Sequence, residues 1–94
     1  MALARVVEFE GVSKDRVEQM KQMMQGVEPP QGLPAMEFVW LHDGERERSL
    51  VIQFFDSEED YQHAAAVLDA MPADETPGRR TSVTKYDVAH RQSV

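Results

Sequence analysis

The sequence contains no cysteine, few aromatic residues and no long apolar run. The lack of cysteine excludes disulfide bonds, cysteine–zinc sites and thiol catalysis, and it suits the reducing cytoplasm. No stretch approaches the roughly 20 apolar residues that a membrane-spanning helix needs. The first residues lack a basic segment followed by an apolar run, so we expect no signal peptide. These absences together predict a cytoplasmic protein.

Cationic residues are also scarce, because ten Lys and Arg stand against seventeen Asp and Glu, which leaves a net charge of −7. Nucleic acids and anionic membrane surfaces are bound by clustered cations, so this acidity argues against both as partners. The hydrophobic share of 41% and the charged share of 29% exclude wholesale disorder. With 94 residues, we expect a single domain over 1–94, with its core at 3–88 and a tail at 89–94.

Sequence motifs for common chemistries are missing as well. The three histidines are too far apart for a His-x-His or His-x₃-His metal site. The sequence has no Gly-x-Ser-x-Gly elbow, no Gly-x-Gly-x-x-Gly fingerprint and no P-loop. We therefore expect neither a metal nor another cofactor, and the sequence leaves open whether the protein is an enzyme.

Hydrophobic periodicity divides the chain into six elements. Alternation of apolar, β-branched and aromatic residues predicts strands over 3–12, 35–42, 49–55 and 79–88. Apolar residues three and four apart predict two helices between these strands. The order β-α-β-β-α-β indicates the ferredoxin-like α+β fold, a four-stranded antiparallel sheet with two helices on one face.

Polar residues mark where the two helices begin and end. Ser13 is a good N-cap for the first helix, which should end near Gly26. The second helix has two candidate caps, Asp56 and Ser57, and should end at Pro72. Its predicted inward stripe is narrow and made partly of alanine: Tyr61, Ala64, Ala65, Leu68 and Met71.

The loop between the second and third strands decides which side chains share a face. Asp43 and Gly44 mark a turn there. An odd-length loop puts the apolar stripe of the second strand beside Leu50, Ile52 and Phe54. Since burying one common apolar face is favourable, we predict a loop of three or five residues.

The opposite sheet face is also rich in apolar residues. A small monomer rarely leaves so much apolar surface in contact with water. We therefore predict a homodimer formed through this face, since isologous pairs are the commonest assembly. The expected interface residues are Val39, Leu41, Val51 and Phe55.

The element order, chain length and second apolar face resemble the dimeric α+β barrel superfamily, which includes antibiotic-biosynthesis monooxygenases and stress-responsive barrel proteins. The resemblance covers about residues 3–88 and implies two sheets packed face to face across a two-fold axis. Monooxygenase members often carry Trp-x-Ser at the end of the third strand, where this chain has Phe55, Asp56 and Ser57. The haem-degrading branch uses an asparagine on the first strand, and this sequence contains no asparagine.

A ligand site is expected between the sheet and the helices, because small alanine side chains on the second helix leave space there. Such pockets are mostly apolar with one or two orienting polar groups. The predicted ligand-binding residues are Met36, Phe38, Trp40, His42 and Tyr61.

Three functions are compatible with this arrangement. The first is a dimeric barrel protein that binds a small aromatic or apolar organic ligand. The second is a cofactor-independent enzyme resembling monooxygenases or isomerases, in which His42 would be the base, since imidazole side chains in general exchange protons near neutral pH. The third is an interaction module whose sheet face serves assembly alone.

Overall fold

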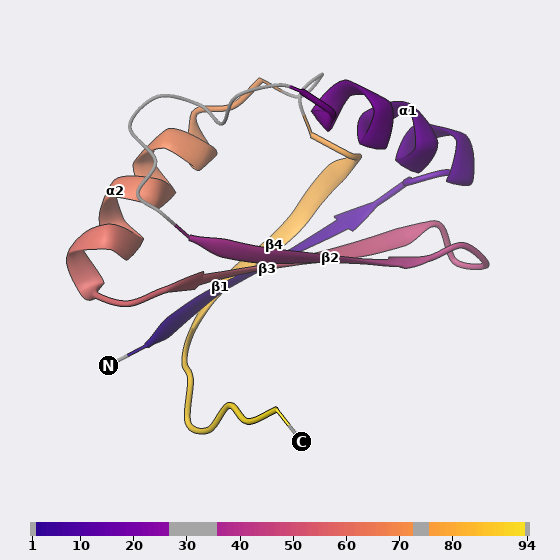
Figure 1. Ribbon diagram of the computed structural model, residues 1–94. Coiled ribbons are helices and arrows are strands. Elements are labelled where there is room, and N and C mark those ends of the chain that lie inside the picture. The colour runs from indigo at the N-terminus through magenta and orange to yellow at the C-terminus, as the bar shows by residue number, and fades with distance from the viewer. Residues whose placement is uncertain (1, 27–35, 73–75, 94) are drawn as a thin grey trace.

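The six elements follow one another in the predicted order (Figure 1). The computed structural model describes residues 2–26, 36–72 and 76–93. The expected ferredoxin-like fold is confirmed, because the strands form one antiparallel sheet in the order β2-β3-β1-β4 with both helices on one face. The elements are β1 (Leu3–Glu10), α1 (Lys14–Met24), β2 (Glu37–Asp43), β3 (Arg48–Phe55), α2 (Glu58–Asp69) and β4 (Arg79–Asp87).

Serine side chains begin both helices. Ser13 Oγ accepts the backbone N–H of Arg16 at 3.1 Å, and Ser57 Oγ accepts that of Asp60 at 3.1 Å. These bonds satisfy amide donors that have no partner inside the helix. Of the two candidate caps for α2, the structure uses Ser57. The first helix stops where expected, with Gly26 in the left-handed region at φ 72°.

The core lies between the sheet and the helices, on the face that carries the odd-numbered side chains of β1. Ala64 of α2 is fully buried against this face, and the other residues of the predicted α2 stripe are half-buried. No residue of α1 is buried, although Val17 packs against the core at its first turn. The core cluster consists of Val7, Phe9 and Val12, with Val17, Trp40 and Val51 packed against it. Val17 is the only α1 residue in this cluster, so α1 covers the cluster loosely.

The hairpin between β2 and β3 corrects the predicted loop length. Asp43 pairs with Arg48, which leaves a loop of four residues, 44–47, instead of three or five. Asp43 Oδ1 accepts the backbone N–H groups of Glu45 and Arg46, at 3.1 and 3.3 Å. Glu47 then turns the chain back with a positive φ of 53°. These local bonds fix an even-length loop, so the even residues of β2 lie beside the odd residues of β3.

Two of the four predicted interface residues consequently lie on the other face. Phe55 is 2% exposed in the helix-side core, and Val51 packs against the core cluster beside Trp40. The prediction for these two residues was wrong because β3 is apolar on both faces, and either register buries an apolar stripe. Val39 and Leu41 do lie on the face without helices, together with Leu50, Ile52 and Phe54.

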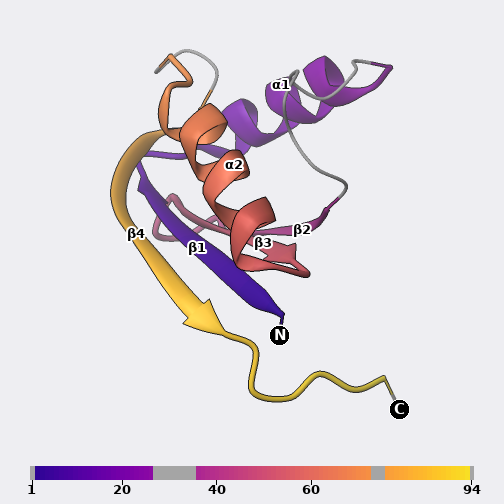
Figure 2. The same ribbon diagram turned by 90° about the vertical axis from the view of Figure 1, so that its left-hand side faces the viewer.

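The face without helices, called the open face below, is partly crossed by the C-terminal tail (Figure 2). The Arg91 guanidinium lies 4.2 Å from the centre of the Phe54 ring and donates to Glu37 Oε1 at 2.5 Å. Val39 and Leu41 remain more than a third exposed on this face. Within the described residues, no helix is long and apolar enough to cross a lipid bilayer.

Candidate functional site

Three predicted ligand residues share the helix side of β2. Phe38 lies opposite Gln53 of β3, Trp40 opposite Val51, and His42 opposite Ser49. Phe38 is 47% exposed, and Trp40 and His42 are half-buried. The alternation of the strand thus places two aromatic rings and one imidazole in a row beneath the loosely covered end of the helix layer.

Polar atoms in this layer lack hydrogen-bond partners. Trp40 Nε1, His42 Nε2 and Arg5 Nε are buried, and none has a partner in the described part of the chain. A buried donor without a partner costs about 1–3 kcal/mol, so most such atoms in folded proteins are satisfied. All three atoms lie on the helix side of the sheet, so the unmatched polar groups of the described residues are concentrated on this face.

The His42 ring is held from its other nitrogen. His42 Nδ1 lies 2.9 Å from Ser49 Oγ on the neighbouring strand. Ser49 is 4% exposed, so this bond is shielded from water. The contact holds the imidazole by Nδ1, while Nε2 is buried and has no partner among the described residues.

Sequence reasoning missed a buried arginine that lies two strands away from Phe38. Arg5 is 3% exposed and donates from Nη1 to Gln53 Oε1 at 3.0 Å and from Nη2 to Asp69 Oδ1 at 2.5 Å. Gln53 lies between Arg5 and Phe38 in the strand register. The available signal was a charged residue in the otherwise apolar odd-numbered stripe of β1, because charges are rarely buried without a function or a partner.

Tyr61 lies apart from the other predicted ligand residues. Its ring meets Phe55 edge-on at 5.5 Å, and Lys85 Nζ lies 5.1 Å from the ring centre. Phe55 follows Ser49, the partner of His42, by six positions on β3, which is roughly 20 Å along a strand. One small ligand therefore cannot touch both Tyr61 and His42, and Met36 precedes β2 near the Phe55 end of the sheet.

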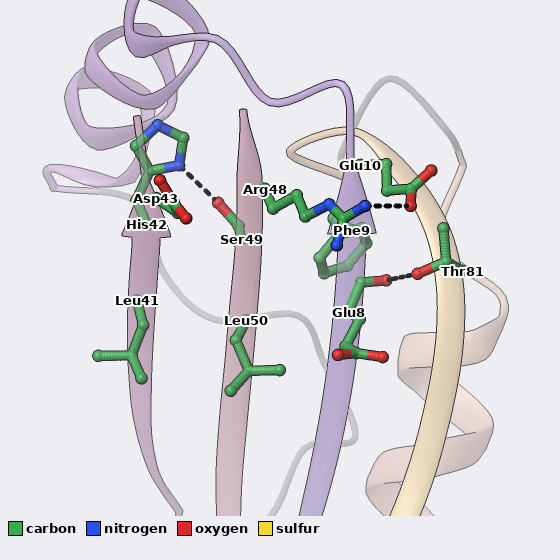
Figure 3. Close-up of a pocket in the computed structure, with 10 residues that line it drawn as sticks. All are labelled: Glu8, Phe9, Glu10, Leu41, His42, Asp43, Arg48, Ser49, Leu50 and Thr81. Carbon is green, nitrogen blue, oxygen red and sulfur yellow. Dashed lines mark hydrogen bonds and ion pairs between the residues drawn. The ribbon is translucent and has the colours of Figure 1, made fainter. Parts of the chain in front are cut away.

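A hollow of about 380 Å³ lies at the hairpin end of the sheet (Figure 3). Phe9, Leu41 and Leu50 form its apolar part, and carboxylates and Arg48 form its rim. The predicted site residue His42 and its partner Ser49 also line it. Most rim groups are already paired: Glu10 contacts Arg79 at 2.6 Å and Arg48 at 3.5 Å. The paired charges make the rim a less suitable place for a ligand than the row of Phe38, Trp40 and His42, which meets the hollow only at His42.

Asp43, one of the carboxylates at the rim of the hollow, also accepts hydrogen bonds from the hairpin turn. The backbone N–H of Arg46, with a smaller contribution from that of Glu45, holds the pKa of Asp43 below its ordinary value of 3.8. The charge of Asp43 thus stabilises the turn. Over the described ranges, no three side chains of His, Asp or Glu gather closely enough to bind a metal ion.

Comparison with known proteins shows a likeness in fold. No protein-family model and no curated protein matches the sequence. A solved structure from Chloroflexus aurantiacus J-10-fl, provisionally described as an antibiotic biosynthesis monooxygenase, is similar to this chain with a TM-score of 0.63. The match is 13% identical in sequence and covers 99% of this chain and 98% of that one. At this identity the match shows a shared fold, and it confirms the expected ferredoxin-like α+β architecture.

Proposed function

We propose that the protein binds a small aromatic or apolar organic ligand between the sheet and the helices, on the helix side of β2. The observation that carries the proposal is the pair of buried, unpartnered polar atoms Trp40 Nε1 and His42 Nε2 in the described chain. They would orient a ligand, and the neighbouring aromatic rings would stack on it. This combination of apolar walls with a few polar groups is typical of small-molecule sites.

Loose cover over this end of the sheet supports the proposal. Phe38 is on the helix side but is 47% exposed, and α1 buries none of its side chains. A flat ring placed against Phe38 and Trp40 would remove apolar surface from water, at about 25 cal/mol per Å². If protein side chains already filled this region, the Phe38 ring would be buried and a ligand would remove no further apolar surface from water.

The proposal is tested with naphthalene-type compounds in a calorimetric titration, using two variants of β2. Phe38→Glu places a charge on the helix side, whereas Leu41→Glu places the same charge on the open face at a similar exposure. We expect wild type and Leu41→Glu to bind, and Phe38→Glu to lose binding at least about tenfold, because the bound ligand would cover the new charge and remove it from water. Equal binding by the two variants, or no binding by wild type, would contradict the proposal.

A second candidate is an enzyme resembling cofactor-independent monooxygenases or isomerases, in which His42 is the base. The specific observation is the anchored imidazole: the tautomer that donates from Nδ1 to Ser49 leaves Nε2 free to accept a proton from a phenolic ligand. The resulting substrate anion would pass an electron to molecular oxygen. Quinol-dependent oxygen uptake that falls in His42→Gln by a much larger factor than the ligand affinity does would establish this activity.

The third part of the proposal is a cytoplasmic homodimer formed through the open face. Apolar side chains of β2 and β3 are exposed on that face, and a protein of this size gains a second core by pairing. Val39 and Leu41 would lie at the interface. An assembly module without a ligand would show this pairing and no binding of aromatic compounds.

A further inference from the structure

The C-terminal tail places a positive charge on the apolar open face. The Arg91 guanidinium lies 4.2 Å from the centre of the Phe54 ring and pairs with Glu37 Oε1 at 2.5 Å. Phe54 and Glu37 are opposite each other in the register of β2 and β3, on the side without helices. One side chain of the tail therefore contacts two neighbouring strands of this face.

The tail is held at its base and is exposed beyond it. The backbone N–H of Val88 donates to the carbonyl oxygen of Ala2 at 3.0 Å, which continues the pairing of β4 with β1. Beyond Val88 the chain runs below the sheet on the side without helices (Figures 1 and 2), and residues 89–93 are exposed. Arg91 can therefore leave the open face without disturbing the strands.

Arg91 lies beside the predicted dimer interface. Glu37 and Val39 share one face of β2 and are two positions apart, which is about 7 Å along a strand. Tyr86 belongs to the same row of the open face as Phe54, because both pair with Ala4, and it is 53% exposed. The guanidinium thus stands among the apolar side chains that a second copy would cover.

A second sheet cannot pack closely here while Arg91 stays in place. Sheets that pack face to face lie about 10 Å apart, and their side chains interdigitate in that space. A guanidinium on Phe54 occupies part of it. Enclosing the charge would cost more than the half-exposed pair with Glu37 contributes, so pairing of two copies requires Arg91 to move away.

We propose that the C-terminal tail and a second copy of this chain compete for the open face, and that Arg91 is the residue that holds the tail there. The inference rests on the proposed homodimer and adds its regulation. With Arg91 on Phe54 and Glu37, the open face is unavailable to a second copy. With Arg91 released, the whole face is available for pairing.

The test measures the dissociation constant of the dimer by sedimentation equilibrium in wild type, Arg91→Gln and Lys21→Gln. Arg91→Gln keeps a side chain of similar length and removes its charge. We expect its dissociation constant to fall at least about fivefold, because both copies must release a tail and the unavailable fraction counts twice. Lys21→Gln removes the same charge from an exposed site on α1 and should not lower the constant.

The net charge of the chain makes this comparison sharp. Both substitutions remove one positive charge from a chain with a net charge of −7, so both add to the repulsion between copies. Repulsion alone predicts weaker pairing in both variants. Stronger pairing in Arg91→Gln alone is therefore the signature of the competition.

The inference and the dimer fail in different ways. An unchanged or higher dissociation constant in Arg91→Gln would overturn the inference and leave the dimer standing, as would an equal fall in Lys21→Gln. A monomeric wild type at micromolar concentration would overturn the dimer and the inference together. Arg91 is 51% exposed, so Arg91→Gln should keep the fold, and circular dichroism checks this.

Discussion

Gly78 marks a point at which two segments of backbone come too close for a side chain. A Cβ atom at this position would lie 2.5 Å from the carbonyl oxygen of Glu10 and 2.8 Å from Val12 Cγ2. Val12 is fully buried, so it has little room to move. Because Gly78 has no side chain, the start of β4 can lie directly against the end of β1.

We expect Gly78→Ala to destabilise the protein by about 1–3 kcal/mol, because the added methyl overpacks a rigid site. Gly11→Ala is the control, since its Cβ would meet nothing within 4 Å and would cost only about 1 kcal/mol through its positive φ. Urea unfolding of both variants measures the difference. A loss of stability in Gly78→Ala no larger than that in Gly11→Ala would contradict the close approach.

The ion pair between Glu58 and Lys85 links the start of α2 to β4. Hydrogen bonds from Lys85, and to a smaller extent from Gln62, hold the pKa of Glu58 below its ordinary value of 4.5. A lowered pKa in the folded state means that this stabilisation is present above pH 4.5 and is lost as the pH falls through the folded value.

An NMR titration of the Glu58 carboxyl carbon should therefore have a midpoint below 4.5 in wild type. Lys85→Met should move that midpoint upward, because it removes the main cause of the shift. Gln62→Ala is the matched comparison and should move it less. A midpoint that does not respond to Lys85→Met would mean that the ion pair is absent in solution.

At the level of elements, local sequence patterns determined the strands and helices, whereas pairing between strands required the structure. The positions of Ser13, Gly26 and Ser57 predict helix ends because capping depends on neighbouring residues only. The register of β2 against β3 depends on the hairpin turn, where the side chain of Asp43 and the positive φ of Glu47 act together.

The residues of the candidate site were likewise predictable only where their grouping depends on local sequence. Phe38, Trp40 and His42 could be grouped from the sequence because alternation along one strand is a local property. The separation of Tyr61 from His42, and the presence of Arg5, depend on which strands are adjacent. Periodicity within one segment contains no information on that order.

The cap of α2 gives a prediction at the element scale, because two neighbouring residues compete for the role. Ser57→Ala should reduce the free energy of unfolding by about 1 kcal/mol, since the N–H of Asp60 loses its acceptor. Asp56→Ala, one residue earlier and exposed, should have almost no effect. Thermal unfolding of both variants decides this, and a larger loss in Asp56→Ala would assign the cap to Asp56.

At the scale of the whole molecule, β2 contributes side chains to both proposed functional surfaces. The helix side of β2 carries the proposed ligand residues, and its open side carries Val39 and Leu41. Ligand binding and dimer formation should therefore be separable by substitutions in a single strand.

Light scattering coupled to size exclusion should report about twice the chain mass of 10.7 kDa for wild type and for Phe38→Glu. Leu41→Glu should report one chain mass, because a charge at the centre of an apolar interface prevents pairing. Circular dichroism is the control for folding in each case. A monomeric wild type at micromolar concentration would exclude the dimer.

The even length of the hairpin loop has a consequence for insertions and deletions. Removing one residue from 44–47 would rotate β2 by one position relative to its neighbour and exchange its two faces. Trp40 would then point toward solvent and Leu41 toward the helices, so a single-codon deletion should abolish folding or binding in a library selected for either. An insertion of two residues keeps the loop length even and leaves each side chain of β2 on its original face. Length changes that are tolerated at this loop should therefore come in pairs of residues.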